Sequence, residues 1–136
     1  MVIKYNDIFY KFIETFISYG RPDLILKDET FANFNDDIIA EYKKIRREEL
    51  DYFKASMILL DGQHFTDDAF IYFFPMLVKH ILDHNGHIDA VILRLRSIDM
   101  TKYSENEVDV IKKMAEALDE MKQNYDDDSN EIILMV

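Results

Sequence analysis

The sequence predicts an all-α fold, a single helical domain over residues 1–136 with about five to six helices bundled around a central helix over 66–84. The main observation is an apolar stripe that keeps a helical spacing along this central segment. A second is the position of all three glycines, Gly20, Gly62 and Gly86, each directly after a stretch with helical periodicity. Helices often end on such a glycine, because glycine adopts the left-handed cap conformation without a side-chain penalty.

The central segment reads FTDDAFIYFFPMLVKHILD. Its apolar stripe consists of Phe70, Phe73, Phe74, Leu77, Val78 and Ile81, widened by Ile71 and Leu82. The other side holds only Tyr72, Met76, Lys79, His80 and Asp83. A stripe this wide must be covered from several directions, which predicts a central position, with Thr66 as the N-cap. Pro75 costs about 3 kcal/mol or more inside a helix, but the stripe keeps its phase across the proline. One kinked helix is therefore favoured over two short ones.

The N-terminal half predicts three further elements. A first helix begins at Asn6 and ends at Gly20, before Pro22, and the run Leu24-Ile25-Leu26 is predicted as a short strand. Asp36 and Asp37 suit the start of a second helix, because carboxylates are favourable at the positive end of the macrodipole. A third stretch from Arg46 ends at Leu60, continuous with the second helix or separate from it. Its predicted buried face is Leu50, Phe53, Met57 and Leu60.

In the C-terminal half, residues 88–95 predict a short helix and residues 97–103 a connector. Ser104 and Glu107 form a capping box, which starts a last helix that reaches about Lys122. Its predicted buried face is Val108, Ile111, Met114, Ala115, Leu118 and Met121. Residues 126–130 are predicted as a turn. The apolar end, 131–136, could be a strand, dock in a groove or fray, and as a strand it could pair with Leu24–Leu26.

The cysteine content and net charge of the chain limit the kinds of partner that it can have. The chain has no cysteine and a net charge of −11, which excludes disulfides and disfavours nucleic acid as a partner. The N-terminus has no signal-peptide pattern and no long uncharged apolar run occurs, so we expect a cytoplasmic protein that does not enter the membrane. A basic protein is the partner that this charge favours, although acidity for solubility alone is the simpler alternative.

The negative charge is concentrated near the C-terminus, where the segment from Glu105 to Glu131 contains ten acidic residues and three lysines. Pairs at i and i+4, such as Asp109 with Lys113 and Lys112 with Glu116, indicate a solvated helix face in the middle of this segment. They leave the end of the segment unexplained, where the macrodipole disfavours negative charge. We therefore predict a partner-binding site made of Asp119, Glu120, Tyr125, Asp126, Asp127 and Asp128, with the tyrosine as an aromatic anchor. The basic run Lys43–Arg47 could bind this acidic end, in the same chain or in a second copy.

One cluster could bind a metal. His80 and His84 are spaced i and i+4, so both imidazoles could face one ion, with Asp83 and His87 nearby. No glutamate follows the first histidine and His87 lies beyond a glycine, so a helix that simply ends in histidines is the favoured interpretation. No glycine-rich phosphate loop or nucleophile elbow is present. We expect no enzyme activity and no cofactor.

The run from Ile38 through Asp83 resembles a bacterial family of small helical proteins of unknown function, especially in the pattern Leu60-x4-Phe65-Thr66-x3-Phe70-x-Tyr72-Phe73-x-Pro75. Members share a leucine, then Ser/Thr-Pro-Glu-Ala-Phe, then Tyr-Tyr-Leu-Pro. This chain differs in having Asp67 where proline is usual and Phe73-Phe74 in place of Tyr-Leu. The resemblance covers about a third of the chain and implies an all-α fold with an internal proline, but no catalytic residues.

By composition alone, the chain also resembles immunity proteins that neutralise bacterial toxins, which are often small, acidic and free of cysteine. The leading hypothesis is therefore an immunity-like or antitoxin-like protein that covers the active or substrate-binding surface of a basic toxin, such as a nuclease. The alternatives are a small metal-dependent enzyme centred on His80 and His84, and a structural homodimer without another partner.

Overall fold

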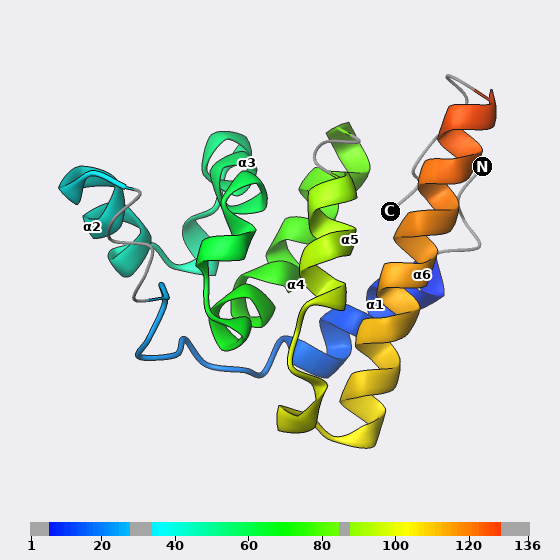
Figure 1. The fold of residues 1–136 in the computed structure, drawn as a ribbon, viewed down its shortest axis with the longest axis horizontal. Coiled ribbons are helices and arrows are strands. Elements are labelled where there is room, and N and C mark those ends of the chain that lie inside the picture. Colours follow the sequence, from blue (N-terminus) through cyan, green and yellow to red (C-terminus); the bar gives the residue numbers. More distant parts are fainter. Residues whose placement is uncertain (1–5, 28–33, 85–87, 129–136) are drawn as a thin grey trace.

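A computed structural model describes residues 6–27, 34–84 and 88–128, and within these ranges the side chains of 78–84 and 124–128 are not described. The described residues form six α-helices and no strand, so the predicted all-α fold is confirmed. The helices are α1 (Asn6–Phe16), α2 (Asp36–Lys44), α3 (Tyr52–Leu60), α4 (Asp67–His84), α5 (Ile88–Arg96) and α6 (Glu105–Asp128). Three short 3-10 helices connect them: η3 (Arg47–Glu49), η4 (Gly62–His64) and η5 (Met100–Lys102). Along the long axis of the molecule, α2 lies at one end and α6 at the other (Figure 1).

Helix α4 lies in the middle of this arrangement, as its wide stripe predicts. All its described residues from Ala69 to Leu77 except Met76 are buried. Its rings pack against α1, where the centroids of Phe12 and Phe74 are 4.8 Å apart. The predicted polar position Tyr72 is wrong: this residue is only 4% exposed. Arg47 of η3 covers it, with its guanidinium 4.8 Å from the ring centroid.

The start of α4 and its internal proline agree with the predictions. The Thr66 hydroxyl accepts a hydrogen bond from the Ala69 amide at 3.2 Å, which is the expected N-cap contact. Pro75 lies inside one continuous helix that ends at His84. Packing on several sides therefore outweighs the hydrogen bond that the proline removes.

The short strand predicted at Leu24–Leu26 does not form, and this run makes only a single β-bridge, to a segment other than the expected one. Leu26 forms an isolated antiparallel bridge with Phe65. On either side of this bridge, Lys27 N donates to His64 O at 2.9 Å and Thr66 N donates to Ile25 O at 3.0 Å. The proposed partner, residues 131–136, lies outside the described residues. The bridge fixes the start of α4 against the chain that follows α1.

The predicted buried face of α3 is wrong at two of its four residues, whereas Leu50 and Met57 are partly buried against the core. Phe53 and Leu60 point outward and are largely exposed, whereas the buried residues are Ala55, Ile58 and Leu59. The helix is apolar on both sides, so periodicity alone does not indicate which side faces the core. α3 is also separate from α2, because α2 ends at Lys44 and Asp51 caps α3 through a 2.8 Å hydrogen bond from Lys54 N.

Glycine does not play the predicted left-handed cap role at Gly20 or Gly62. Neither residue has a positive φ. Gly20 has no neighbour near its would-be side chain, whereas a Cβ at Gly62 would lie 3.0 Å from Cε1 of Phe70. Gly62 is therefore needed for close packing of η4 on α4. Gly86 lies outside the described residues.

The last helix is longer than predicted. Ser104 and Glu107 form the expected capping box, with the Glu107 carboxylate accepting from Ser104 N at 2.9 Å and the Ser104 hydroxyl accepting from Glu107 N at 3.2 Å. The helix then continues past Lys122 to Asp128, so the turn predicted from residue 126 is wrong for 126–128. The predicted buried face is confirmed at Ile111, Met114, Ala115, Leu118 and Met121. Val108 is only half-buried, and Val110 and Ala117 are buried in addition.

The two described glycines predict opposite effects of the same substitution. Gly62→Ala should lower the free energy of unfolding by about 1–3 kcal/mol, because Phe70 is fully buried and has little room to move. Gly20→Ala should raise it by about 0.4–1 kcal/mol, because alanine restricts the unfolded chain and meets no atom in the folded one. Urea denaturation of the two variants measures both values. Equal effects at the two positions would contradict this account of Gly62.

Candidate functional site

The predicted partner-binding residues all lie on the second half of α6. This helix packs mainly on α5 and α1 and forms one end of the molecule (Figure 1). Between Glu105 and Gln123, the buried residues of this helix are apolar and its acidic residues are exposed or half-buried. Of the predicted site residues, the structure describes the side chains of Asp119 and Glu120, and the helix places both at this end of the molecule.

Ion pairs join the described part of the acidic side of α6 to α5. Arg96 Nη2 lies 3.2 Å from the Asp119 carboxylate, and Lys122 Nζ lies 2.5 Å from that of Asp89. Asp119, predicted as a partner-binding residue, is thus already engaged within the chain, although its side chain remains 37% exposed. Sequence reasoning missed this, because the pair joins residues 23 positions apart.

Among the other predicted residues, the structure describes the side chain of Glu120 but not those of Tyr125 to Asp128. Glu120 is exposed, as is Glu116 one turn earlier, a residue that was not among the predicted set. Tyr125, Asp126, Asp127 and Asp128 belong to the last turns of α6, and their side chains are outside the described part. No basic residue lies in the last turn of the helix. The end of α6 is thus a helix terminus with negative charge at its negative pole.

The basic run at Lys43–Arg47 does not bind the acidic end of the same chain. It begins in the last turn of α2 and reaches the first residue of η3, on the opposite side of the molecule from α6 (Figure 1). Lys44 pairs with Glu41 at 3.5 Å. Arg47 covers Tyr72, and its Nη1 donates to Tyr72 O at 3.3 Å. This run is therefore partly structural.

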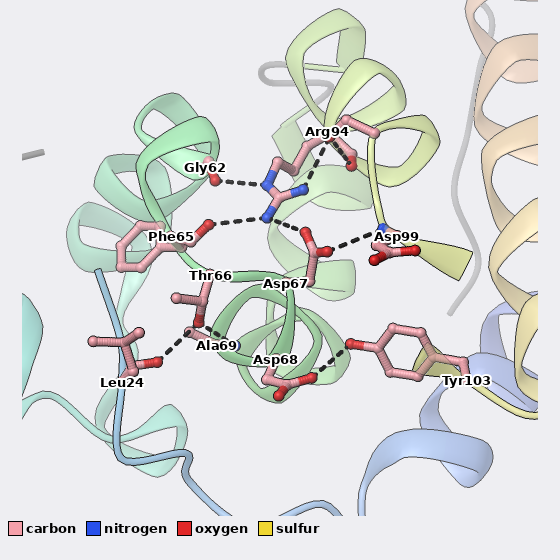
Figure 2. Close-up of polar contacts among 11 residues, drawn as sticks. Leu24, Gly62, Phe65, Thr66, Asp67, Asp68, Ala69, Arg94, Asp99 and Tyr103 are labelled. Atoms are coloured by element: carbon pink, nitrogen blue, oxygen red, sulfur yellow. Dashed lines mark hydrogen bonds and ion pairs between the residues drawn. The ribbon is translucent and has the colours of Figure 1, made fainter. Parts of the chain in front are cut away.

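A second polar cluster, centred on Arg94, was not predicted (Figure 2). Arg94 is 5% exposed and lies within 2.9 Å of every group to which it donates. Nε donates to Gly62 O, Nη1 to the Ser97 hydroxyl, and Nη2 to both Phe65 O and the Asp67 carboxylate. The guanidinium also lies over the Phe70 ring, 5.3 Å from its centroid. These bonds saturate most of its donors, which is typical of a structural arginine.

Asp67 completes this cluster. Burial opposes its ionisation, but the hydrogen bond from Asp99 N and the hydrogen bond and charge of Arg94 together hold the pKa of Asp67 below its usual value. The Asp99 N bond to the second carboxylate oxygen is 3.0 Å long. Both oxygens are thus engaged, so the carboxylate is a poor candidate for acid-base chemistry.

Three tyrosine hydroxyls are held by carboxylates in a similar way. Tyr103 donates to Asp68 at 2.8 Å, Tyr42 donates to Asp61 at 2.5 Å, and Tyr19 donates to Glu107. Burial, followed by these hydrogen bonds, raises the pKa of each tyrosine, that of Tyr19 to about 12. Hydroxyls that hold their protons so firmly are hydrogen-bond donors rather than bases or nucleophiles.

The metal hypothesis concerns side chains that the structure does not describe. His80, Asp83 and His84 are in the part of α4 whose side chains are not described, and His87 lies between the described ranges. Elsewhere in the described chain, no group of three or more histidine, aspartate or glutamate side chains could hold a metal ion. Within the same ranges, no helix combines the length and hydropathy needed to cross a membrane.

Comparisons with known proteins leave the chain without a family assignment. No family model matches the chain, and no curated protein or solved structure matches it significantly.

The buried arginine and its exposed neighbour on α5 predict different costs for the same substitution. Arg94→Met should lower the free energy of unfolding by about 3–5 kcal/mol, because it leaves the largely enclosed Asp67 charge and two carbonyl groups without their donor. Arg96→Met removes only the exposed pair with Asp119 and should cost about 0–1 kcal/mol. Urea denaturation at neutral pH distinguishes the two. A small cost at Arg94 would show that the cluster does not support the fold.

The lowered pKa of Asp67 predicts a loss of stability in acid. Its ionised form stabilises the fold fully above its unfolded pKa of about 3.9, and this contribution is lost as the pH falls through the lowered folded value. Below about pH 4, the free energy of unfolding should therefore fall more steeply for the wild type than for Asp67→Asn. Asp109→Asn, which affects an exposed pair with Lys113, serves as the control and should keep the wild-type slope. Parallel slopes for all three proteins would show that Asp67 does not cause the loss of stability in acid.

Proposed function

We infer that this chain is an acidic protein-binding module of the immunity or antitoxin kind, which covers the active or substrate-binding surface of a basic bacterial toxin. The observation that carries this inference is the end of α6, where Asp126, Asp127 and Asp128 close the helix without a basic residue in the last turn. The macrodipole opposes each such charge by about 0.3–1 kcal/mol. A basic partner surface offsets this repulsion, which gives the unfavourable placement a physical role.

The charge balance of α6 supports the same inference. The helix carries nine acidic residues against three lysines, and two of these lysines pair with Asp109 and Asp89. Glu116 and Glu120 are exposed one turn apart, where like charges repel. α6 therefore carries a surplus of acidic residues, and some of them, such as Glu116 and Glu120, are exposed.

Such a surface acts mainly through the rate of association. Attraction between opposite charges steers the two proteins together and can raise association rate constants to about 10⁸–10⁹ M⁻¹s⁻¹ at low salt. Specificity requires short-range contacts as well, and Tyr125 is the proposed aromatic anchor among the acidic residues. The net charge of −11 works against the phosphate backbone of nucleic acids, so the partner is a protein.

The test uses the protein encoded by the neighbouring reading frame, because immunity proteins are normally encoded beside their toxins. In the α6 variant, five exposed or terminal acids are neutralised: Glu116→Gln, Glu120→Gln, Asp126→Asn, Asp127→Asn and Asp128→Asn. The control removes the same amount of charge from exposed positions outside α6: Asp7→Asn, Glu14→Gln, Asp23→Asn, Asp37→Asn and Glu48→Gln. Stopped-flow or surface-based kinetics at several salt concentrations give the association rate constant.

We expect the α6 variant to associate about tenfold more slowly than the wild type at low salt, and the control variant to change by about twofold or less. Added salt should reduce this difference, because it screens the attraction. Equal rates for the two variants would contradict a role for α6. A neighbouring protein that does not bind at all, and whose toxicity this chain does not relieve on co-expression, would contradict the immunity function itself.

A further inference from the structure

An apolar stripe lies exposed on α3 and continues onto α5. Phe53 and Leu60 of α3 are 70% and 59% exposed, and Leu93 of α5 is 69% exposed. Phe53 and Leu60 are seven residues apart, about two turns, so they project from the same side of α3. Met57 lies between them and is half-buried. This outer side of α3 therefore has the apolar spacing of a surface that packs against another helix.

A groove of about 390 Å³ adjoins one end of this stripe, between α3, η4 and α5. Leu60 lines it from α3 and Leu93 from α5, with Lys27 at its margin and Arg94 deeper in. The Arg94 guanidinium already donates to two backbone carbonyls, a hydroxyl and a carboxylate, so a polar ligand would gain little from it. The groove is thus better suited to an apolar side chain than to a charged small molecule.

We propose that this face binds the same face of a second copy, with the two α3 helices antiparallel about a two-fold axis near Ser56 and Met57. Phe53 of each copy then enters the groove between Leu60 and Leu93 of the other. The protruding ring and the groove lie toward opposite ends of one helix, so a single two-fold operation fills both grooves at once. Ser56, a small residue near the axis, allows the helices to approach closely.

The charges at the two ends of α3 select the antiparallel arrangement. Asp51 caps the N-terminal end of the helix, and Lys27 lines the groove at the C-terminal end. In an antiparallel pair, Asp51 of each copy lies beside Lys27 of the other. A parallel pair instead places Asp51 beside Asp51 and leaves both grooves without a ring. Charge and shape therefore indicate the same pairing.

The salt dependence of this pairing separates it from binding through α6. Each copy carries a net charge of −11, so overall repulsion opposes self-association at low salt and is screened as salt is added. Binding of a basic partner to α6 has the opposite dependence. The pairing also uses other residues than α6, so it stands or falls independently of the proposed function.

Sedimentation equilibrium over a range of protein and salt concentrations tests the pairing. We expect a monomer-dimer equilibrium in which dimer increases with protein concentration and with salt. Phe53→Ser and Leu93→Ser should each raise the dissociation constant by about tenfold or more, without loss of the fold, since both side chains are exposed. Tyr10→Ser, at an exposed aromatic residue of α1, is the matched control and should dimerise like the wild type.

Disulfide trapping tests the register, because the chain has no native cysteine. Phe53→Cys and Leu93→Cys proteins, mixed and oxidised, should form a covalent dimer that contains one of each. Ser56→Cys alone should cross-link to itself across the axis, whereas Phe53→Cys alone should not. Circular dichroism of each variant confirms that it is folded.

Four results would overturn the proposal. One is a wild-type chain that stays monomeric at every concentration and salt, and another is a Phe53→Ser variant that dimerises like the wild type. A third is efficient self-cross-linking of Phe53→Cys, which would place the rings at the axis rather than in the grooves. The fourth is a monomeric chain whose Phe53→Ser variant loses the basic partner, which would assign this face to that partner instead.

Discussion

The buried guanidinium of Arg94 is the contact on which much of the structure depends. It joins η4, the first turn of α4 and the end of α5 through hydrogen bonds to Gly62, Phe65, Asp67 and Ser97. Removing an arginine charge from water is costly, and this cost is met only because carbonyl oxygens and a carboxylate surround the group. Gly62 serves this cluster in two ways: its carbonyl accepts from Arg94, and its lack of a Cβ lets the backbone pack closely on Phe70.

The start of α4 is consequently the junction of the fold. Within its first turn, Asp67 holds α5 through Arg94, and Asp68 accepts from Tyr103, which follows η5 (Figure 2). The residue before it, Thr66, donates its hydroxyl to Leu24 O, in the chain that follows α1. Polar contacts thus place three distant segments at one end of α4. The aromatic residues of α4 then fill the centre of the bundle. Hydrogen bonds thus determine how the neighbouring segments are oriented around α4, and burial of apolar side chains supplies most of the stability.

The sequence predicted correctly those contacts that join residues close together in the chain. The cap at Thr66 and the capping box of Ser104 and Glu107 were predicted correctly, because they join residues three positions apart. The contacts of Arg94 and Asp119 were not, because each pairs with a residue 23 or more positions away. The buried side of α3 was predicted incorrectly at Phe53 and Leu60 for another reason. Both sides of the helix are apolar, so its neighbours determine which side is buried. For the acidic site, the sequence located the charge on the last helix but not its partial neutralisation by α5.

Helix α5 shows why residue type alone does not assign a role in this protein. Leu93 is exposed at the groove, Arg94 is buried in the polar cluster, Leu95 is buried in the core and Arg96 pairs with Asp119 on α6. Each step along a helix turns the side chain by about 100°, so four successive residues meet four different environments. One leucine and one arginine are therefore buried, while the other leucine and the other arginine are exposed. α3 and α6 pack against α5 from different sides, so the two proposed binding surfaces, on α3 and on α6, do not overlap.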